Sequence, residues 1–454
     1  MPKKFDAIVV GGGPAGCAVG ALLSKRGYRV ALLEKEAAVG GRASSFQYQG
    51  YTVDTGSHFA AAFDSSGMQA IFEEVGADIE MIQVTPTLMS FDLGTRQYGP
   101  LTSKEKLGED ARDDYRAVRR IIKEMSSEEL AKPHYHEVSA HQWIGEVTQN
   151  PKVQDTFRRA TGFAGASMSE ISAGAFIETM HDAWNAKAVV NYPAKGGCIR
   201  ISQVLADRVA AGGGEIHTET AVKQVVVQNG RVTGVKAIKT YSAGLTVTKI
   251  DFEADLVICA VAGSQLFSIL DKRVLDPVLV LKIEAIISEG TIYCGLLAGV
   301  EGELFKGFGD GQQFFQFTVG HAAEHWHGLV TVPTYVDPSL APPGHHYLVC
   351  NSHGRLPLSR RNEAPTLHDK CLNALRNIWP DRFDSHLDWL LRCEYMNVLY
   401  APRVGRTGPH RPSIAATGVE GLRIAGDYTY PCGSGYGCAF KSARDCVRLI
   451  DNAT

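Results

Sequence analysis

The first fifty residues carry the clearest pattern of apolar and polar positions in the chain. An apolar run at 7–10 leads into a glycine-rich turn, an alanine- and leucine-rich stretch follows at 14–27, and a second apolar run occupies 28–34. Short apolar runs beside glycine predict buried strands, and the alanine-rich stretch predicts a helix that ends near Gly27. The pattern therefore predicts strand, helix and strand in that order, as in a nucleotide-binding βαβ unit.

The middle of the chain alternates between helical and strand patterns. Residues 66 to about 190 place charged and apolar positions at helical spacing and predict a mostly helical region, interrupted by short strands and turns within 79–101. From about 271 to 400, strands and turns dominate the pattern, and a helix is predicted over 364–381. No internal repeat or low-complexity tract interrupts the chain.

Two further segments have distinct local signals. The glycine pair at 196 and 197 predicts the start of a helix that ends at glycines 212 to 214, and Asn229-Gly230 between apolar runs predicts a β-hairpin. A buried strand is expected in "LVICAVA". Near the end of the chain we expect a short strand, a turn at Gly426-Asp427 and a helix from about Ala439.

The N-terminal glycines have the spacing of a dinucleotide-binding turn. Gly11, Gly13 and Gly16 follow a predicted strand and open a predicted helix, and Glu34 ends the next strand. In this context the glycines allow the backbone to approach a pyrophosphate at the helix N-terminus, and the carboxylate can accept ribose hydroxyl hydrogens. Arg42 follows a glycine pair, and its planar guanidinium can bind an anionic diphosphate. The alternative is a solvated surface arginine that binds no ligand.

These motifs carry a resemblance to a known family. "GGGPAG…LLEKEAAVGGRASSF…YTVDTGSHF" resembles the amino-terminal signature of FAD-dependent amine oxidases and phytoene-desaturase-type enzymes. The loop "DPSLAPPG" is similar to one in the phytoene-desaturase-type branch. At this end of the chain the resemblance implies FAD contacts from Gly11, Gly13, Pro14, Ala15, Gly16, Glu34, Lys35, Gly41, Arg42, Gly56 and Ser57.

The resemblance extends to two later segments. Residues 190–270 resemble the part of the family that embraces the adenine, where Val222 is a candidate contact, although a valine in a hairpin needs no function. The segment from Gly426 resembles the third FAD segment and implies contacts from Gly426, Asp427, Gly435 and Tyr436. Helix N-terminal amides at that point would stabilise negative charge on a reduced flavin.

The resemblance also implies a fold and a division of the chain. We expect an α/β fold with a Rossmann-type FAD-binding domain of glutathione-reductase-like topology and an interleaved α+β substrate domain. The FAD-binding domain would combine residues 1–65, 190–270 and 401–454. The substrate domain would combine 66–189 and 271–400.

Flavin chemistry needs a substrate C–H over the flavin N5, and a base only where a proton leaves with the hydride. Tyr436, Tyr430 and His58 are the candidates because they lie in motifs expected near the flavin, and aromatic packing is the alternative role for each. Some amine oxidases hold a water near N5 with a lysine. Lys195 and Lys441 are near cofactor motifs, but neither can be assigned that role from the sequence.

The function favoured is that of an FAD-dependent desaturase or dehydrogenase that takes hydride from an apolar, alicyclic or isoprenoid small molecule and forms a double bond. A flavin amine oxidase, a redox-neutral FAD-dependent isomerase and a non-enzymatic FAD-binding protein remain alternatives. Oxygen, a quinone or another carrier is the expected electron acceptor. Oligomeric state is left open.

Composition and residue spacing argue against several other classes of protein. The net charge of −3 gives no reason to expect nucleic acid, and no apolar run reaches the length of a membrane span, which leaves peripheral membrane contact open. The cysteines occur singly and favour a reducing cytoplasm. No metal site is expected: "HAAEH" at 321–325 lies in a strand-rich region and "PHYHEVSAH" lacks compact ligand spacing. FAD is expected to bind non-covalently, since Cys432 and Cys438 match no covalent flavin position convincingly.

Overall fold

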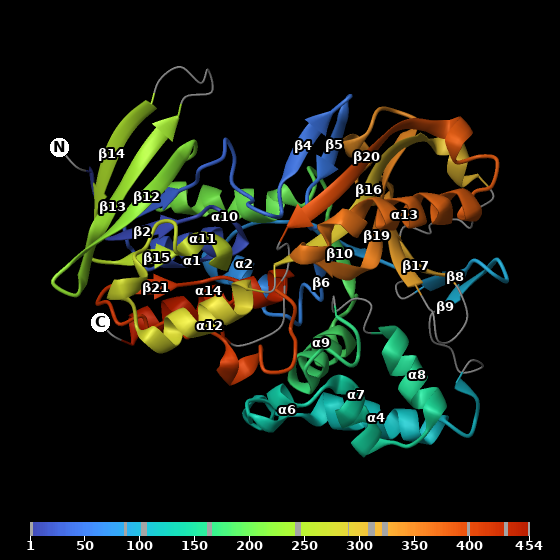
Figure 1. The fold of residues 1–454 in the computed structure, drawn as a ribbon. Helices are drawn as coiled ribbons and strands as arrows, with labels where there is room; N and C mark the ends of the chain where they lie inside the picture. Colours follow the sequence, from blue (N-terminus) through green and yellow to red (C-terminus); the bar gives the residue numbers. More distant parts are fainter. Residues whose placement is uncertain are drawn as a thin grey trace.

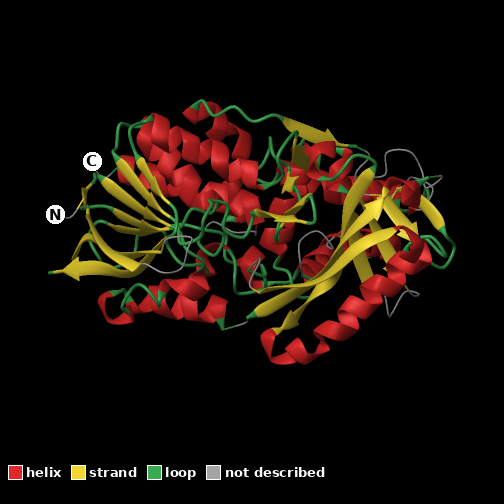
Figure 2. Ribbon diagram, turned by 90° about the horizontal axis from the view of Figure 1, so that it is seen from above, coloured by secondary structure: helices red, strands yellow, loops and turns green. Residues whose placement is uncertain are grey.

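The protein is described here from a computed structural model. It describes residues 3–85, 89–100, 107–160, 166–240, 247–288, 290–306, 314–319, 326–396, 400–430 and 435–452. Figure 1 shows a body with a parallel sheet on the left, a second sheet with a covering helix on the right, and a group of helices below them. Seen from above, sheets stand at both ends of the molecule (Figure 2).

Among the described residues, five strands form a parallel sheet. Their order is β11 (Glu215–His217), β3 (Val30–Leu33), β2 (Ala7–Val10), β15 (Val257–Cys259) and β21 (Leu422–Ile424). Successive side chains of a strand point to opposite faces. Ala7 and Val9 accordingly pack in one core, and Ile8 and Val10 pack in another. Both faces of the sheet are therefore buried, which explains the continuous apolar runs in the sequence.

Helices cover one face of the parallel sheet. They are α1 (Pro14–Lys25), α2 (Met68–Val75), α10 (Ile199–Ala211) and α14 (Gly435–Asp451). The C-terminal end of α1 forms a Schellman motif, in which Tyr28 N–H donates to Leu23 O and Gly27 N–H donates to Ser24 O. Gly27 has a φ of 87°, so the prediction that this glycine ends the helix is confirmed.

Antiparallel strands and two helices, α11 (Gly263–Leu266) and α12 (Pro277–Ile287), cover the other face. The strands are β12 (Thr220–Gln228), β13 (Arg231–Thr240) and β14 (Val247–Glu253), with β1 (Lys3–Lys4) at the edge. Asn229 and Gly230 have φ values of 50° and 77°, so the predicted hairpin is confirmed as a turn with two left-handed residues. Helices α11 and α12 pack beside these strands.

A seven-stranded sheet forms the second body. Its order is β20 (Leu387–Met396), β16 (Thr291–Glu301), β19 (His345–Pro357), β18 (Trp326–Thr331), β17 (Phe314–Val319), β8 (Met89–Asp92) and β9 (Gln97–Pro100). Helix α13 (Ala364–Ile378) confirms the helix predicted over 364–381, and it covers one face of the sheet. The other face packs against β5 (Tyr51–Asp54), which pairs with β4 (Ser45–Tyr48), and against β10 (Val190–Pro193), whose neighbours are β6 (Ala60–Ala61) and β7 (Met81–Val84).

Helices between β9 and β10 form a separate cluster, which we call the helical layer. It consists of α4 (Arg112–Glu124), α5 (Ser127–Leu130), α6 (His134–Glu137), α7 (Ala140–Val147), α8 (Pro151–Ala160) and α9 (Ala173–Asn185). Most of them share one apolar core. The predicted helical character of this region is confirmed, as are the short strands β7, β8 and β9 that precede the layer.

Two expectations about elements need correction. The last helix begins at Gly435 rather than near Ala439, so Gly435, Tyr436 and Gly437 lie in its first turn. Residues 277–287 are helical, although strands and turns were expected to dominate there. The helix α12 packs with Leu279 and Ile283 in the core of the antiparallel strands.

The division of the chain into an FAD-binding domain and a substrate domain stays a prediction. The motif "HAAEH" and Cys432 lie outside the described residues. In the ranges that are described, no helix is both long and apolar enough to cross a membrane.

Candidate functional site

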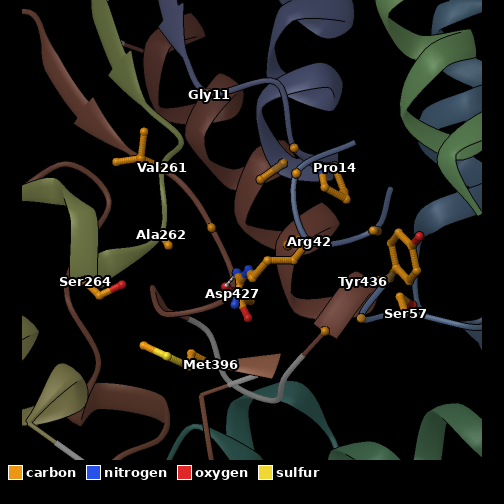
Figure 3. Close-up of a pocket in the computed structure, with 18 of the residues that line it drawn as sticks. Gly11, Pro14, Arg42, Ser57, Val261, Ala262, Ser264, Met396, Asp427 and Tyr436 are labelled. Carbon is orange, nitrogen blue, oxygen red and sulfur yellow. Dashed lines mark hydrogen bonds and ion pairs between the residues drawn. The ribbon is translucent and has the colours of Figure 1, made fainter. Parts of the chain in front are cut away.

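A cavity of about 1220 Å³ lies where the parallel sheet, the seven-stranded sheet and the helical layer meet. Figure 3 shows Arg42 and Asp427 near its centre, with Val261 and Ser264 on one side and Ser57 and Tyr436 on the other. The volume exceeds the range of about 300–1,000 Å³ that is usual for small-molecule pockets. The cavity therefore has room for a large cofactor beside a second molecule.

Most residues predicted to bind the cofactor line this one cavity. They come from both ends and the middle of the chain: Gly11, Gly13, Pro14, Ala15, Glu34, Lys35, Gly41, Arg42, Gly56, Ser57, Val222, Gly426, Asp427, Gly435 and Tyr436. Gly16 is not part of the lining. A side chain at Gly16 would overlap the carbonyl oxygen of Gly11, so this glycine permits α1 to pack against the turn.

The turn after β2 leaves space for an anionic group. Gly11 has a φ of 105°, and a β-carbon there would lie 2.8 Å from the carbonyl oxygen of Ala260. A β-carbon at Gly13 would meet only Gly41, at 3.9 Å. The N-terminus of α1 has no side-chain cap and no acidic residue in its first turn. Its free amides and the helix dipole favour a phosphate at this point.

Glu34 is held at the end of β3 by backbone amides. Its carboxylate accepts hydrogen bonds from Gly12 N–H at 2.7 Å and from Glu36 N–H at 2.9 Å. The side chain is almost fully buried yet borders the cavity. A carboxylate fixed in this way can accept additional bonds from hydroxyl groups, because each oxygen has more than one acceptor position.

Arg42 and Asp427 form an ion pair between the first and third segments. The Nη2 of Arg42 lies 2.6 Å from the Oδ1 of Asp427, which is only 3% exposed. Burial lowers the pKa of Arg42, but the charges of Asp427, Tyr400 and Tyr428 and the hydrogen bond to Asp427 together outweigh burial, and the pKa lies above its usual value. The guanidinium also lies over the ring of Tyr400, at 5.6 Å. Arg42 is thus a fixed cation at the cavity wall.

A second arginine, Arg411, binds the backbone of the turn that carries Asp427. Arg411 is 2% exposed, and its Nη1 donates to the carbonyl oxygen of Asp427 at 2.5 Å. Its Nε donates to Arg406 O at 3.1 Å. Cys438 lies 3.4 Å from the same Nη1, and burial raises the pKa of its thiol to about 12. The thiol of Cys438 is therefore protonated at neutral pH.

His58 is one of the residues of the cavity wall. Both of its ring nitrogens are buried and unpaired among the described residues, and the ring of Tyr395 packs edge-on against it at 6.3 Å. Burial lowers the pKa of His58 from 6.5 to about 4. The imidazole is therefore neutral at physiological pH and offers one donor and one acceptor.

Tyr436 occupies the first turn of α14, close to Ser57 in Figure 3. Its hydroxyl is buried and makes no hydrogen bond of ordinary geometry with the described residues. Burial and the nearby Cys198 raise its pKa well above the usual value. The hydroxyl therefore stays protonated and acts as a donor.

Other predicted residues lie away from the cavity. Tyr430 is 40% exposed and is not among the lining residues. Lys441 is paired with Glu178 at 2.9 Å and with Asp182 at 2.8 Å, so it joins α14 to α9. Lys195 is also absent from the lining. Neither lysine therefore stands where it could hold a water in the cavity.

Asp54, the first residue of the "DTGSH" motif, lies behind the wall. It accepts hydrogen bonds from Ser45 at 2.6 Å, from Cys198 N–H at 2.9 Å, from Tyr347 at 3.1 Å and from Tyr192. These partners come from β4, β10, β19 and the residues before α10. The buried carboxylate fixes the loop that leads to Gly56 and His58.

Sequence reasoning missed two groups of lining residues. The first group follows β15 and includes Ala260, Val261 and Ser264, at the carboxyl end of a parallel strand where ligands usually bind. The second group comes from the seven-stranded sheet, the helical layer and its surroundings, and no local motif indicates it. It comprises Tyr293, Leu329, Asn351 and Met396 from the seven-stranded sheet, and His141, Arg158, Ser167, Glu170 and Arg403 from the helical layer and its surroundings.

His136, one of the histidines of "PHYHEVSAH", has structural partners. His136 contacts Thr407 Oγ1 at 2.9 Å and Leu130 O at 2.9 Å. Within the described ranges, no three histidine, cysteine, aspartate or glutamate side chains are grouped to hold a metal ion.

A cavity at the carboxyl ends of a parallel sheet, with a glycine-rich turn and a buried acid after the second strand, is typical of dinucleotide-binding proteins. Residues 14–450 match the flavin-containing amine oxidoreductase family. The chain therefore belongs to this family.

Curated relatives are distant. A 4,4'-diapophytoene desaturase from Methylomonas sp. is 27% identical over 52% of this chain and 51% of its own length, so the match spans about half of that enzyme. Prolycopene isomerase from Daucus carota is 23% identical over 98% of this chain and 80% of its own length. The Arabidopsis thaliana prolycopene isomerase is 26% identical over 76% and 62%. The chain is thus related to carotenoid desaturases and isomerases.

Solved structures share the fold. An oxidoreductase from Methanosarcina mazei superposes with a TM-score of 0.73 at 19% identity, covering 98% of this chain and all of the other. Putrescine oxidase bound to putrescine gives a TM-score of 0.66 at 15% identity, over 99% of this chain and all of the other. The expected α/β flavoprotein fold is therefore confirmed.

Proposed function

We propose that the chain binds FAD non-covalently in the 1220 Å³ cavity and catalyses removal of hydride from a C–H of an apolar small molecule, with formation of a double bond. One observation carries the proposal: the three separate segments that resemble FAD-binding motifs all line the same cavity. The sequence similarity to a carotenoid desaturase supports desaturation of an isoprenoid or alicyclic skeleton.

The residues present fit a dinucleotide. Gly11, Gly13 and the first turn of α1 would receive the diphosphate, and Arg42 would contribute positive charge beside it. Glu34 would accept bonds from the adenosine ribose, with Val222 near the adenine. Asp427 and the first turn of α14 would face the flavin side. The protonated thiol of Cys438 supports non-covalent binding, because a thiol is a much weaker nucleophile than a thiolate.

When bound, FAD would supply the hydride acceptor for this chemistry, with oxygen, a quinone or another carrier as the final acceptor of the two electrons. Desaturation also breaks a neighbouring C–H bond, whose electron pair becomes the new π bond while its proton goes to a base. His58 stays the candidate for this base on its position in the cavity lining, although burial lowers the pKa of its imidazole to about 4 and makes it a weak base. Tyr436 is retained as a donor that orients the substrate. We assign Tyr430 no role in the cavity.

A redox-neutral isomerisation is a second candidate. The prolycopene isomerase of Daucus carota matches nearly the whole chain, whereas the desaturase matches about half of it. In that case the substrate would return to its original oxidation state within one catalytic cycle, and no external acceptor would be consumed.

Anaerobic mixing of the purified protein with a panel of amines, cyclic ketones and polyenes tests the function. Loss of the oxidised-flavin absorbance with a ketone or polyene, and a product two hydrogens lighter, would support desaturation. A product of unchanged mass would support isomerisation. Reduction by amines alone would reject the desaturase proposal.

A paired variant tests the cofactor site. Glu34→Ala combined with Arg42→Ala is expected to lose most of its bound FAD, measured as flavin absorbance per protein after gel filtration. The matched control is Arg360→Ala combined with Glu363→Ala, which removes an exposed ion pair remote from the cavity lining. Full FAD content in the first variant would refute the assignment.

A further inference from the structure

Helix α12 carries apolar side chains on the side that faces away from the core. Val278 is 58% exposed and Leu281 is 64% exposed, and residues three apart lie on the same side of a helix. Val274, just before the helix, is also exposed. We call these three side chains the apolar stripe. Helix α12 lies at the front of the molecule, facing the viewer, in Figure 1.

The other side of α12 is fixed to the body of the protein. Leu279 and Ile283 are buried and pack in the core that α12 shares with the antiparallel strands. The Nζ of Lys282 donates to the carbonyl oxygen of Pro409 at 2.7 Å. The helix therefore cannot turn the apolar stripe inward without breaking these contacts.

The chain leads from α12 directly to an end of the seven-stranded sheet that borders the cavity. Gly290, three residues after the end of α12, accepts a hydrogen bond from Leu358 N–H at 2.6 Å. Ile292 pairs with Met396, which lines the cavity. Leu358 and Met396 are both exposed. Five of the ten exposed large apolar side chains in the described ranges thus belong to the stripe or to this end of the sheet.

The charges beside the apolar stripe balance one another. Lys272 pairs with Glu284 at 2.6 Å, and Arg273 pairs with Asp271 at 2.6 Å. Residues 271–284 have no net charge, because they contain three cations and three anions: Lys272, Arg273, Lys282, Asp271, Asp276 and Glu284. A segment without net charge exerts little long-range attraction on nucleic acid, a charged protein or an anionic lipid. Any partner of the stripe is therefore held by its apolar area.

The apolar stripe is too small for a stable protein interface. A standard interface buries about 800 Å² on each partner and takes roughly 20–30 residues a side, whereas the stripe consists of three. Binding to a bilayer scales with the apolar area inserted and needs no matching partner surface. The 11 residues of α12 extend over about 17 Å, well short of the roughly 30 Å of a hydrocarbon core, so the helix can lie in a membrane surface but cannot cross it.

We propose that the apolar stripe inserts into one leaflet of a phospholipid membrane and that the protein binds the membrane reversibly through this face. The apolar substrate of the proposed function dissolves in the same hydrocarbon, and Met396 brings the border of the cavity to the sheet end next to α12. The surface itself is defined by exposure and charge and does not depend on the proposed function. Val278 and Leu281 are the residues that insert.

Flotation of the purified protein with lipid vesicles measures this binding. The vesicles contain phosphatidylcholine alone or phosphatidylcholine mixed with phosphatidylglycerol, each at low and at high salt. We expect the protein to float with both kinds of vesicle. The bound fractions should agree within about two-fold, because salt screens only interactions between charges.

Paired substitutions assign the binding to the apolar stripe. Val278→Ser combined with Leu281→Ser is expected to weaken vesicle binding about ten-fold or more, because two apolar side chains no longer leave water. The matched control is Val247→Ser, which replaces a similarly exposed apolar residue on β14 and should leave binding unchanged. Thermal melts check that both variants are folded.

A tryptophan at the stripe reports insertion directly. Brominated acyl chains should quench the fluorescence of Leu281→Trp more than that of the wild type, because an inserted side chain lies about 5–10 Å into the boundary between headgroups and acyl chains. Val247→Trp should show no added quenching.

The inference is overturned if the wild-type protein floats with neither kind of vesicle, or only with the anionic vesicles at low salt. It is equally overturned if the folded serine pair binds like the wild type, or if Leu281→Trp shows no added quenching. A dimer that the serine pair dissociates in sedimentation would show that a second copy covers the stripe, and would also reject it. None of these measurements involves turnover, so a failure here leaves the proposed function standing, and a protein that binds vesicles without transferring electrons would reject only the proposed function.

Discussion

At the scale of single residues, His58 links the cavity to the stability of the protein. Its pKa falls from 6.5 to about 4 on burial, so the unfolded chain binds more protons than the folded one between these pH values. The resulting contribution to the unfolding free energy is fully present above pH 6.5 and is lost as the pH falls toward 4. A shift of this size corresponds to about 3 kcal/mol.

We therefore expect urea unfolding to show that the wild-type protein loses about 3 kcal/mol more than a His58→Gln variant when the pH is lowered from 7 to 4. His134→Gln serves as the control, because His134 is exposed. A wild-type protein and a His58→Gln variant with the same pH dependence would contradict the assignment of a neutral, buried imidazole.

Two helical glycines make a second residue-scale comparison. A β-carbon at Gly16 in α1 would overlap Gly11 O, whereas a β-carbon at Gly145 in α7 would meet nothing within 4 Å. Gly16→Ala should therefore destabilise the protein by about 2 kcal/mol or more. Gly145→Ala should stabilise it by up to about 1 kcal/mol. Denaturant midpoints of the two variants check this, and equal shifts in one direction would contradict it.

Residues whose positions are set by a short local motif could be predicted from the sequence. Gly11, Gly13 and Glu34 have a fixed spacing within one βαβ unit, so their positions follow once that unit is recognised. Asn351 and Arg411 were missed for a physical reason. Their roles depend on pairing with strands and turns far away in the chain, and neither belongs to a local motif.

At the scale of elements, the turn between β21 and α14 depends on Arg411. This guanidinium donates to the carbonyl oxygens of Asp427 and Arg406, and therefore joins the turn to the segment before it. Arg411→Met would leave both carbonyl groups without this donor in a buried region. We expect a loss of about 2–4 kcal/mol in unfolding free energy and weaker FAD retention.

Arg411→Lys is the informative companion variant, since it keeps the charge but loses the fork that reaches two acceptors. It should recover only part of the stability measured by urea unfolding. Unchanged stability and FAD content in Arg411→Met would show that the turn holds without this contact.

In helix α12, the sequence signals for a helix start were present, but the β-branched composition led to the expectation of strands. Its apolar, β-branched sequence favours a strand by composition. Asp276, however, accepts hydrogen bonds from Val278 N–H and Leu279 N–H, and Pro277 occupies the first helical position. An acidic N-cap followed by proline is a helix start signal, so the helix could have been predicted. The start of α14 at Gly435 was less accessible, because glycines at 435 and 437 favour a turn.

At the scale of the whole molecule, the cavity is the place where separate parts of the chain meet. The parallel sheet supplies the turn after β2, the C-terminal segment supplies Asp427, and the seven-stranded sheet and the helical layer supply the opposite wall. The fold class followed from the sequence because its three cofactor motifs are local. The opposite wall could not be predicted, because it exists only after the two bodies are packed together.

FAD bound in this cavity as proposed would contact several segments of the chain and should stabilise them together. Removal of FAD is expected to lower the melting temperature by a few degrees, since ligand at one hundred times its Kd contributes about 2.7 kcal/mol. Added FAD should restore the melting temperature. FMN should not, because it lacks the adenosine half that Glu34 and the turn after β2 would bind. Differential scanning calorimetry of the cofactor-free protein with each ligand measures this, and equal recovery with FMN would contradict the proposed orientation of FAD in the cavity.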